Sequence, residues 1–234
     1  MHWFYKPDLN ITASDIIIED TEAHHCNVLR IMPEEKVGIT DGKGNVVIAY
    51  LKNKTKQICL FKVIKIIKNY NKRFYFLHIA IAPPKNIDRF EFFIEKSTEI
   101  GIDRITPIYT KRTERRKIRT DRLEKIAIAA IKQSHNAYKP TIDQIISFEK
   151  FIEIENTKSS QKFITVCNAE QFLLNTINFD IKKFIVIIGP EGGFEQYEIE
   201  KAKLAGYKAV KLANNILRTE TAGIVATTNF ILKF

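Results

Sequence analysis

The fold class is decided by residues 184–194, which read FIVIIGPEGGF. Residues 184–188 form an uninterrupted apolar run, which is typical of a strand buried on both faces of a parallel sheet. A glycine-rich turn follows, and a helical pattern then covers residues 195–205, with Gly206 at its end. A strand, a glycine-rich turn and a helix in this order indicate an α/β domain whose backbone can approach a ligand closely at the turn.

The turn itself, 189–193, excludes two common phosphate-binding loops. No Gly-Lys-Ser or Gly-Lys-Thr follows it, and Pro190 and Glu191 interrupt any GxGxxG pattern. A carboxylate inside the turn disfavours a phosphate and suits a neutral or cationic cofactor. A turn with a purely structural role is the alternative interpretation.

A second polar loop follows the next expected strand, 209–212. Residues 216–222 read ILRTETA and precede a last helix that we expect to begin near Thr219. The threonines are also suited to capping this helix, and Arg218 and Glu220 to forming an ion pair. Because loops after neighbouring parallel strands meet at one end of the sheet, we expect both loops to share one ligand site.

The whole chain divides into two regions with different sequence patterns. Residues 1–70 read as short strands, with a hairpin around the turn 41–45, and they predict a small β-barrel domain. A polar linker, 68–72, separates them from an α/β domain over 73–234. The further elements expected in that domain are strands at 74–81, 105–109 and 163–167 and helices at 88–100, ended by Gly101, and 121–134.

The positive charge of the chain is concentrated in one segment. Residues 104–139 hold eleven Lys or Arg against three acidic residues, which is +8 of the net charge of +10. Such a segment is typical of proteins that bind a polyanion. A solvated helix face in a lysine-rich protein would have the same composition, so charge alone leaves both interpretations open.

Cysteine usage and hydropathy predict a reducing, cytoplasmic setting. The three cysteines are far apart, which argues against disulfides and a zinc site. His24 and His25 beside Cys26 are weak evidence for a metal, because no second ligand cluster exists, and we expect none. No apolar run of membrane-spanning length occurs, and the first residues lack a signal pattern.

The two polar loops together resemble the bacterial 16S ribosomal RNA (uracil-N3) methyltransferase family of the SPOUT superfamily. The resemblance rests on IGPEGGF at 188–194 and ILRTETA at 216–222. It extends to HHCNVLR at 24–30, KSTEIG at 96–101 and KQS at 132–134, in the family's order along nearly the whole chain.

The resemblance implies a PUA-like RNA-binding β-barrel over 1–70 and a trefoil-knotted parallel-sheet domain over 73–234. It implies a cytoplasmic homodimer that uses S-adenosylmethionine to methylate 16S ribosomal RNA, with the assembled small subunit as the expected partner. Two positions depart from the family pattern, Ala213 in place of Gly and Asn215 in place of Arg. The residues that the resemblance assigns to the cofactor are Cys167, Asn168, Gly189, Glu191, Gly192, Gly193, Leu212, Ala213, Ile216 and Leu217.

Methyl transfer to uracil N3 requires removal of an imide proton or stabilisation of the resulting anion. Glu191 and Glu220 are the candidate bases, and the residue types do not choose between them. Arg218 is the candidate for stabilising charge on the base or for binding a phosphate, and Glu220 could instead hold Arg218 in place. The expected RNA contacts are Arg30, Arg112, Arg115 and Arg116.

Two other functions remain open at this point. A knotted methyltransferase of another kind would act on transfer RNA or on a ribose hydroxyl. A non-catalytic RNA-binding or ribosome-assembly protein would keep the basic segment, but it would not need Glu191, Arg218 and Glu220.

Overall fold

The computed structural model describes residues 1–155 and 159–234. Contacts divide the chain into two compact units. The first unit comprises 1–72 and 128–139, and the second comprises 73–127 and 140–234. Helix α3 (Thr120–Ser134) contributes residues to both units.

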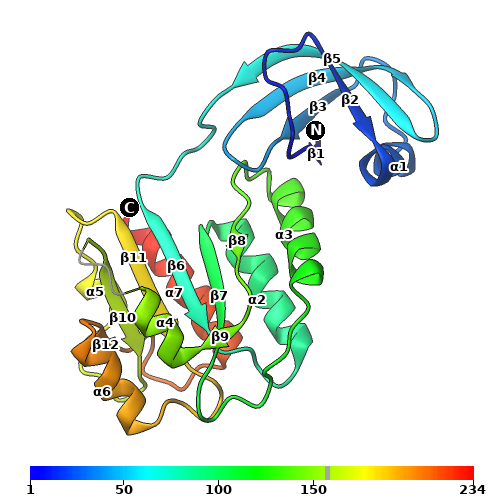
Figure 1. Cartoon of the computed structure of the whole chain (residues 1–234). Helices are drawn as coiled ribbons and strands as arrows, with labels where there is room; N and C mark the ends of the chain where they lie inside the picture. Colours follow the sequence, from blue (N-terminus) through cyan, green and yellow to red (C-terminus); the bar gives the residue numbers. More distant parts are fainter. Residues whose placement is uncertain (156–158) are drawn as a thin grey trace. The chain divides into compact units, whose positions relative to one another are not determined.

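The first unit is a curled five-stranded sheet with one short helix (Figure 1). The strand order is β1-β3-β4-β5-β2, antiparallel except for the parallel pair β1–β3. The hairpin predicted around 41–45 is present, because β3 and β4 pair and Asp41 Oδ1 accepts the backbone N–H groups of Lys43 (2.7 Å) and Asn45 (3.1 Å). The elements are β1 (His2–Tyr5), β2 (Asp15–Glu19), α1 (Asp20–Val28), β3 (Lys36–Thr40), β4 (Val46–Lys54) and β5 (Ile58–Ile67).

Helix α1 corrects the expectation that residues 1–70 form only strands. It carries the His24-His25-Cys26 run and buries only Ala23 and Cys26. Because so few of its residues are apolar, the segment shows no regular apolar stripe, and helical periodicity could not be recognised.

Residues 128–139 belong to the first unit through specific contacts. Backbone hydrogen bonds run from Gly44 to Ala137 (2.9 Å) and from Lys139 to Gly42 (2.9 Å). The Trp3 and His135 rings stack with their centroids 5.0 Å apart. The turn of the first hairpin is therefore held by a segment that lies far away in sequence.

The second unit is built on a parallel sheet with the strand order β12-β10-β11-β6-β7-β8, and β9 pairs with β7. In β11 the side chains alternate between two cores, with Phe184, Val186 and Ile188 in one and Ile185 and Ile187 in the other. This burial on both faces explains the uninterrupted apolar run in the sequence. The strands are β6 (Phe76–Ile81), β7 (Arg104–Tyr109), β8 (Thr141–Ile142), β9 (Ile146–Ser147), β10 (Gln161–Thr165), β11 (Lys183–Ile188) and β12 (Lys208–Val210).

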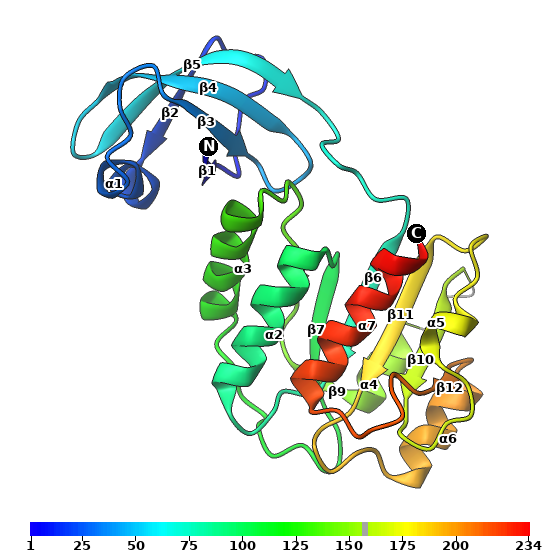
Figure 2. The same cartoon turned by 180° about the vertical axis from the view of Figure 1, so that it is seen from behind.

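Helices cover both faces of this sheet. The larger core contains side chains of α2, α5 and α7, which are seen in Figure 2, and the other core contains those of α4 and α6, on the face seen in Figure 1. Gly101 ends α2 with a φ of 118°, as the sequence predicted. The helices are α2 (Ile87–Ile100), α4 (Phe148–Ile154), α5 (Leu173–Thr176), α6 (Gln196–Leu204) and α7 (Thr219–Lys233).

The segment that joins β12 to α7 crosses the sheet. Strand β12 is the edge strand beside β10, whereas α7 contacts β6 and β11 further into the sheet. The connection between them therefore passes the ends of β10 and β11, where the loops of those strands lie. This path brings three loops to one place.

Some features are absent from the described part of the chain. No helix within residues 1–155 and 159–234 is long and apolar enough to cross a membrane. In the same residues, no three His, Cys, Asp or Glu side chains are grouped so as to hold a metal ion. The three cysteines are free, and burial raises the pKa of the Cys26 thiol to about 12, which keeps it protonated.

Candidate active site

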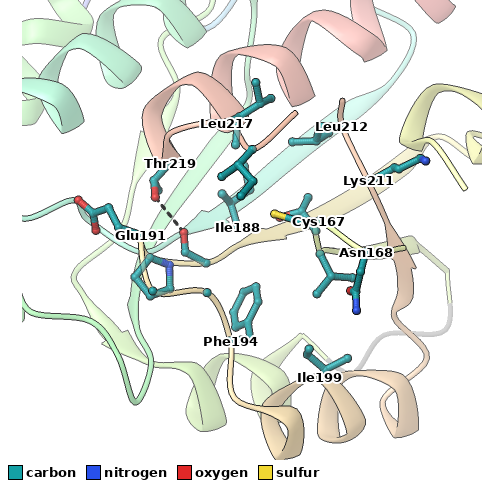
Figure 3. Close-up of a pocket in the computed structure, with 18 of the residues that line it drawn as sticks. Cys167, Asn168, Ile188, Glu191, Phe194, Ile199, Lys211, Leu212, Leu217 and Thr219 are labelled. Carbon is teal, nitrogen blue, oxygen red and sulfur yellow. Dashed lines mark hydrogen bonds between the residues drawn. The ribbon is translucent and has the colours of Figure 1, made fainter. Parts of the chain in front are cut away.

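A cavity of about 400 Å³ lies at the carboxyl ends of β10, β11 and β12. Its walls come from the segments that follow these strands, 165–168, 188–194 and 211–217. Thr219 and Ala222 of α7 complete the wall. Side chains such as Ile188, Cys167 and Phe194 lie around one common space, whereas the Glu191 carboxylate points away from it (Figure 3). This is the position at which open α/β sheets bind ligands.

Every residue assigned to the cofactor from the sequence lines this cavity. They are Cys167, Asn168, Gly189, Glu191, Gly192, Gly193, Leu212, Ala213, Ile216 and Leu217. Apolar side chains that were not assigned to the cofactor add to the wall, notably Phe194 and Ile199. The family resemblance assigned the loop residues, and two of the loops were also indicated by the strands that precede them, whereas Ile199 lies inside a helix and had no signal.

Two positions of the turn require glycine, each for a different structural reason. Gly193 has a φ of +69°, a conformation that residues with a side chain rarely adopt. A Cβ at Gly189 would lie 2.9 Å from the Phe194 ring. The Thr219 hydroxyl donates to the Gly189 carbonyl oxygen at 3.2 Å, the contact drawn in Figure 3. The start of α7 is thereby joined to the turn after β11.

Glu191 is the one acidic candidate that lines the cavity. Its side chain is exposed, and its Oε1 accepts the backbone N–H of Lys85 at 3.1 Å. Lys85 follows β6, so the contact fixes the carboxylate from a neighbouring strand end. The sequence did not single out Lys85, since a backbone donor leaves no mark in residue type.

Arg218 and Glu220 lie next to the cavity but are not among the residues that line it. Arg218 is exposed at the N-cap of α7, whereas Glu220 is only 7% exposed. The anticipated pair between them is not formed. Glu220 Oε1 lies 3.8 Å from Nε of Arg89 on α2 instead. Residues two positions apart at a helix start face different sides, which explains the separation.

The basic candidates of this unit lie in the loop after β7. Arg112 lines the cavity, and its guanidinium donates to the Gly192 carbonyl oxygen (2.6 Å) and to Glu195 Oε1 (3.0 Å). Arg115 donates twice to the Lys85 carbonyl oxygen, at 3.1 and 2.7 Å. The loop is therefore bonded to both the β6 and the β11 loops.

A second hollow, of about 450 Å³, lies on the same loop. It is lined by Lys85, Glu114, Arg115, Arg116 and Lys117, so four cationic side chains face one carboxylate. Glu114 Oε2 lies 3.1 Å from Lys85 Nζ. Arg116 holds its guanidinium 5.3 Å from the centre of the Tyr109 ring, a cation–π contact. The surplus of positive charge makes this hollow suitable for an anion.

Arg30 belongs to the first unit. It follows α1, is exposed, and has a φ of 55°. Near it in sequence, the pKa of His25 is lowered, first by burial and then by Lys132, whose Nζ lies 3.5 Å from its Nδ1.

The second unit is an α/β enzyme scaffold, with a ligand cavity at the carboxyl ends of its strands and a basic loop beside it. The chain belongs to the RNA methyltransferase family. A family described as "RNA methyltransferase domain" matches residues 71–231, and one described as "RNA methyltransferase PUA domain" matches residues 18–64.

The sequences of related proteins match this sequence along most of the chain. A "Ribosomal RNA small subunit methyltransferase E" of Mesomycoplasma hyopneumoniae is 33% identical over 73% of this chain and 75% of its own length. One of Buchnera aphidicola is 29% identical over 96% of this chain and 90% of its own length. The crystal structure of the Neisseria gonorrhoeae protein of that name, bound to S-adenosyl methionine, covers 99% of this chain and 97% of its own, with 28% identity and a TM-score of 0.92.

These findings confirm the predicted fold class, a SPOUT-type α/β domain with a parallel sheet, preceded by a small PUA-like barrel. They also confirm the family that the two loop motifs indicated. The chain is a methyltransferase, which excludes a non-catalytic RNA-binding protein.

Proposed function

We propose that this protein transfers a methyl group from S-adenosylmethionine to N3 of one uridine in 16S ribosomal RNA. The observation that carries the proposal is the cavity at the strand ends, which is lined by the two predicted loops and by residues 165–168. The relatives named small-subunit ribosomal RNA methyltransferases support the RNA substrate. The choice of N3 rests on the resemblance of 188–194 and 216–222 to the uracil-N3 family.

The residues of the cavity fit S-adenosylmethionine. The volume of about 400 Å³ lies in the range of small-molecule sites. Apolar side chains such as Ile188, Phe194 and Leu217 suit an adenine ring, and Glu191 suits a positive charge. The Neisseria gonorrhoeae protein, whose structure resembles this one over nearly its whole length, was crystallised with this cofactor. Bound S-adenosylmethionine supplies an activated methyl group, so the protein must mainly position the acceptor.

Glu191 is the better placed of the two candidate bases. It lines the cavity, and only its Oε1 is engaged, by the Lys85 N–H. Its other oxygen is the natural acceptor for the imide proton of the uracil. Glu220 is nearly buried beside Arg89 and supports the start of α7. Arg218 stays our candidate for stabilising negative charge on the uracil or for holding a phosphate, because it is exposed between the lining residues Leu217 and Thr219.

The hollow beside the β7 loop is the proposed site for RNA phosphates. Arg115 and Arg116 both line it, and the guanidinium group of Arg116 can bind a phosphate in a bidentate manner, whereas Arg115 has one edge bonded to the Lys85 carbonyl oxygen. Arg30, in the region of residues 1–70 that we assign to RNA binding, is a further proposed contact. The match of 18–64 to a PUA domain of RNA methyltransferases supports that assignment.

We further propose that the protein works as a homodimer in the cytoplasm and acts on the assembled small subunit. Exposed apolar side chains at the end of α7, including Leu232 at 73% exposure, support a contact between copies. Sedimentation should give twice the mass of the 27.1 kDa chain. A chain that stays monomeric at micromolar concentration would overturn the dimer.

Calorimetry and methyl transfer together test the proposal. We expect S-adenosylmethionine to bind, and labelled methyl groups to reach small-subunit but not large-subunit ribosomal RNA. Assembled subunits and naked RNA, assayed in parallel, identify the form that is modified. Labelling of transfer RNA would mean a methyltransferase of another substrate class, and failure to bind the cofactor would contradict the proposal as a whole.

A further inference from the structure

Arg112 is an exposed arginine in the most basic segment of the chain, yet its guanidinium faces the cofactor turn. Nε donates to Glu195 Oε1 at 3.0 Å, and a terminal nitrogen donates to the Gly192 carbonyl oxygen at 2.6 Å. The aliphatic stem lies along the same turn, since a Cβ at Gly192 would lie 3.2 Å from Cδ of Arg112. Both the aliphatic stem and the guanidinium of Arg112 therefore contact the loop after β11.

The backbone beside Arg112 is bonded to the same region. The N–H of Lys111 donates to Glu198 Oε1 at 2.9 Å, and Glu198 is fully buried. The other oxygen of Glu198 accepts the N–H of Glu195 at 2.8 Å. One buried carboxylate thus joins the β7 loop to the first turn of α6.

The β7 loop is itself held in shape. The Thr113 hydroxyl accepts the N–H of Thr110 at 2.9 Å, and both threonines are buried. The loop can therefore act as a rigid support for the glycine turn rather than move with it. A glycine turn needs such a support, because glycine has the greatest backbone freedom of all residues.

The charges also fit a cationic ligand. An unpaired guanidinium on the cavity wall would repel a sulfonium ion, but Glu195 lies against Arg112 and offsets its charge. An RNA phosphate would have to compete with Glu195 and with the Gly192 carbonyl for the same donors. Arg112 is thus better suited to the cofactor than to RNA.

We propose that Arg112 is a positioning residue for the methyl donor: it fixes the Gly192 carbonyl and the start of α6 on the cavity wall. The inference rests on the proposed function, because it takes S-adenosylmethionine as the ligand. It removes Arg112 from the expected RNA contacts and leaves Arg115 and Arg116 in that role. The β7 loop then serves the cofactor on one side and RNA on the other.

The test measures cofactor and RNA binding separately. We expect Arg112→Ala to weaken S-adenosylmethionine binding about tenfold by calorimetry, as the loss of a charge-assisted hydrogen bond would. The KM for S-adenosylmethionine should rise while the KM for RNA and the salt dependence of RNA binding stay the same. Arg112→Lys should retain part of the affinity, because an ammonium can reach one acceptor but cannot span both.

Arg119→Ala is the matched control. It removes the same charge from the same segment, where Arg119 pairs with Asp121 at the surface. It should leave the affinity for S-adenosylmethionine unchanged. If Arg112→Ala does not fold, the affinities of Arg112→Lys and Glu195→Gln for S-adenosylmethionine are compared with that of Arg119→Ala instead.

The inference is wrong if the Arg112 variants bind S-adenosylmethionine as the wild type does. It is also wrong if Arg112→Ala weakens RNA binding and lowers the salt slope by about one, the signature of a lost phosphate contact. A wild-type protein that does not bind S-adenosylmethionine would instead overturn the proposed function, so the two failures are distinguishable.

Discussion

Glu191 and Glu220 carry the same functional group in different surroundings. Glu191 is exposed on the cavity wall, and Glu220 is 7% exposed beside Arg89. We predict that Glu191→Gln lowers the rate of single-turnover methyl transfer by about 10²- to 10⁴-fold, the usual contribution of a general base. Its affinity for S-adenosylmethionine should also fall, because Glu191 lines the cavity and its charge favours a cation, so the rate is compared at saturating cofactor. Glu220→Gln should act mainly on the free energy of unfolding, and a larger rate loss for Glu220→Gln would reverse the assignment.

His78 couples the stability of the sheet to pH. It is fully buried on β6, and its Nε2 lies 2.7 Å from the Thr106 hydroxyl oxygen. Burial, and then the charge of Arg104, lower the pKa of His78 from 6.5 to about 3. The charge of Asp143 opposes this shift, but its effect is smaller than that of burial. His78 therefore stays neutral in the folded protein.

The sign of the pH effect follows from that shift. Because the folded pKa lies below the unfolded one, the stability that neutral His78 contributes is present above pH 6.5 and is lost as pH falls towards 3. Between pH 7 and pH 5 the loss should be about 2 kcal/mol. Urea unfolding of wild type and His78→Gln measures it, since glutamine cannot titrate. Parallel pH profiles of the two proteins would refute the prediction.

At the scale of elements, α7 packs on α2 through a glycine. A Cβ at Gly223 would lie 2.4 Å from the ring of Phe93. In open space Gly→Ala would stabilise a helix by about 1 kcal/mol. Here we predict that Gly223→Ala lowers the free energy of unfolding by about 1–3 kcal/mol, because the core cannot accept the methyl group. A more stable variant in chemical denaturation would contradict this close approach.

Elements with a strong local signal could be predicted from sequence, and others could not. The apolar run of residues 184–188 predicted strand β11, and the apolar spacing before Gly101 predicted helix α2. Helix α1 was missed because only two of its residues are buried. The pairing of residues 128–139 with the first hairpin is a long-range contact, and nothing in local periodicity indicates it.

For the site, too, the sequence predicted local features but not long-range contacts. The two polar loops could be located because each follows a strand, and all ten cofactor candidates that the family resemblance assigned line the cavity. What each side chain contacts could not be derived. The Arg89–Glu220 pair and the bonds of Arg112 to Gly192 and Glu195 depend on tertiary structure. The charge of the segment gave no indication that Arg112 contacts the glycine turn.

At the scale of the whole molecule, the basic segment should govern RNA binding. Most of the net charge of +10 lies within 104–139. We predict that affinity for small-subunit ribosomal RNA falls steeply with salt, and that Arg116→Ala lowers the slope of log K against log salt by about one. Filter binding over a range of salt concentrations measures this. A flat salt response of the wild type would contradict a phosphate-binding loop.

The central claim is the transfer of a methyl group to a uracil nitrogen of small-subunit ribosomal RNA. Mass spectrometric mapping of that RNA, after incubation with the protein and isotopically labelled S-adenosylmethionine, tests it most directly. We predict a labelled methyl group on N3 of a single uridine, and its loss with Glu191→Gln. Label on a ribose hydroxyl, or on another base, would contradict the claim.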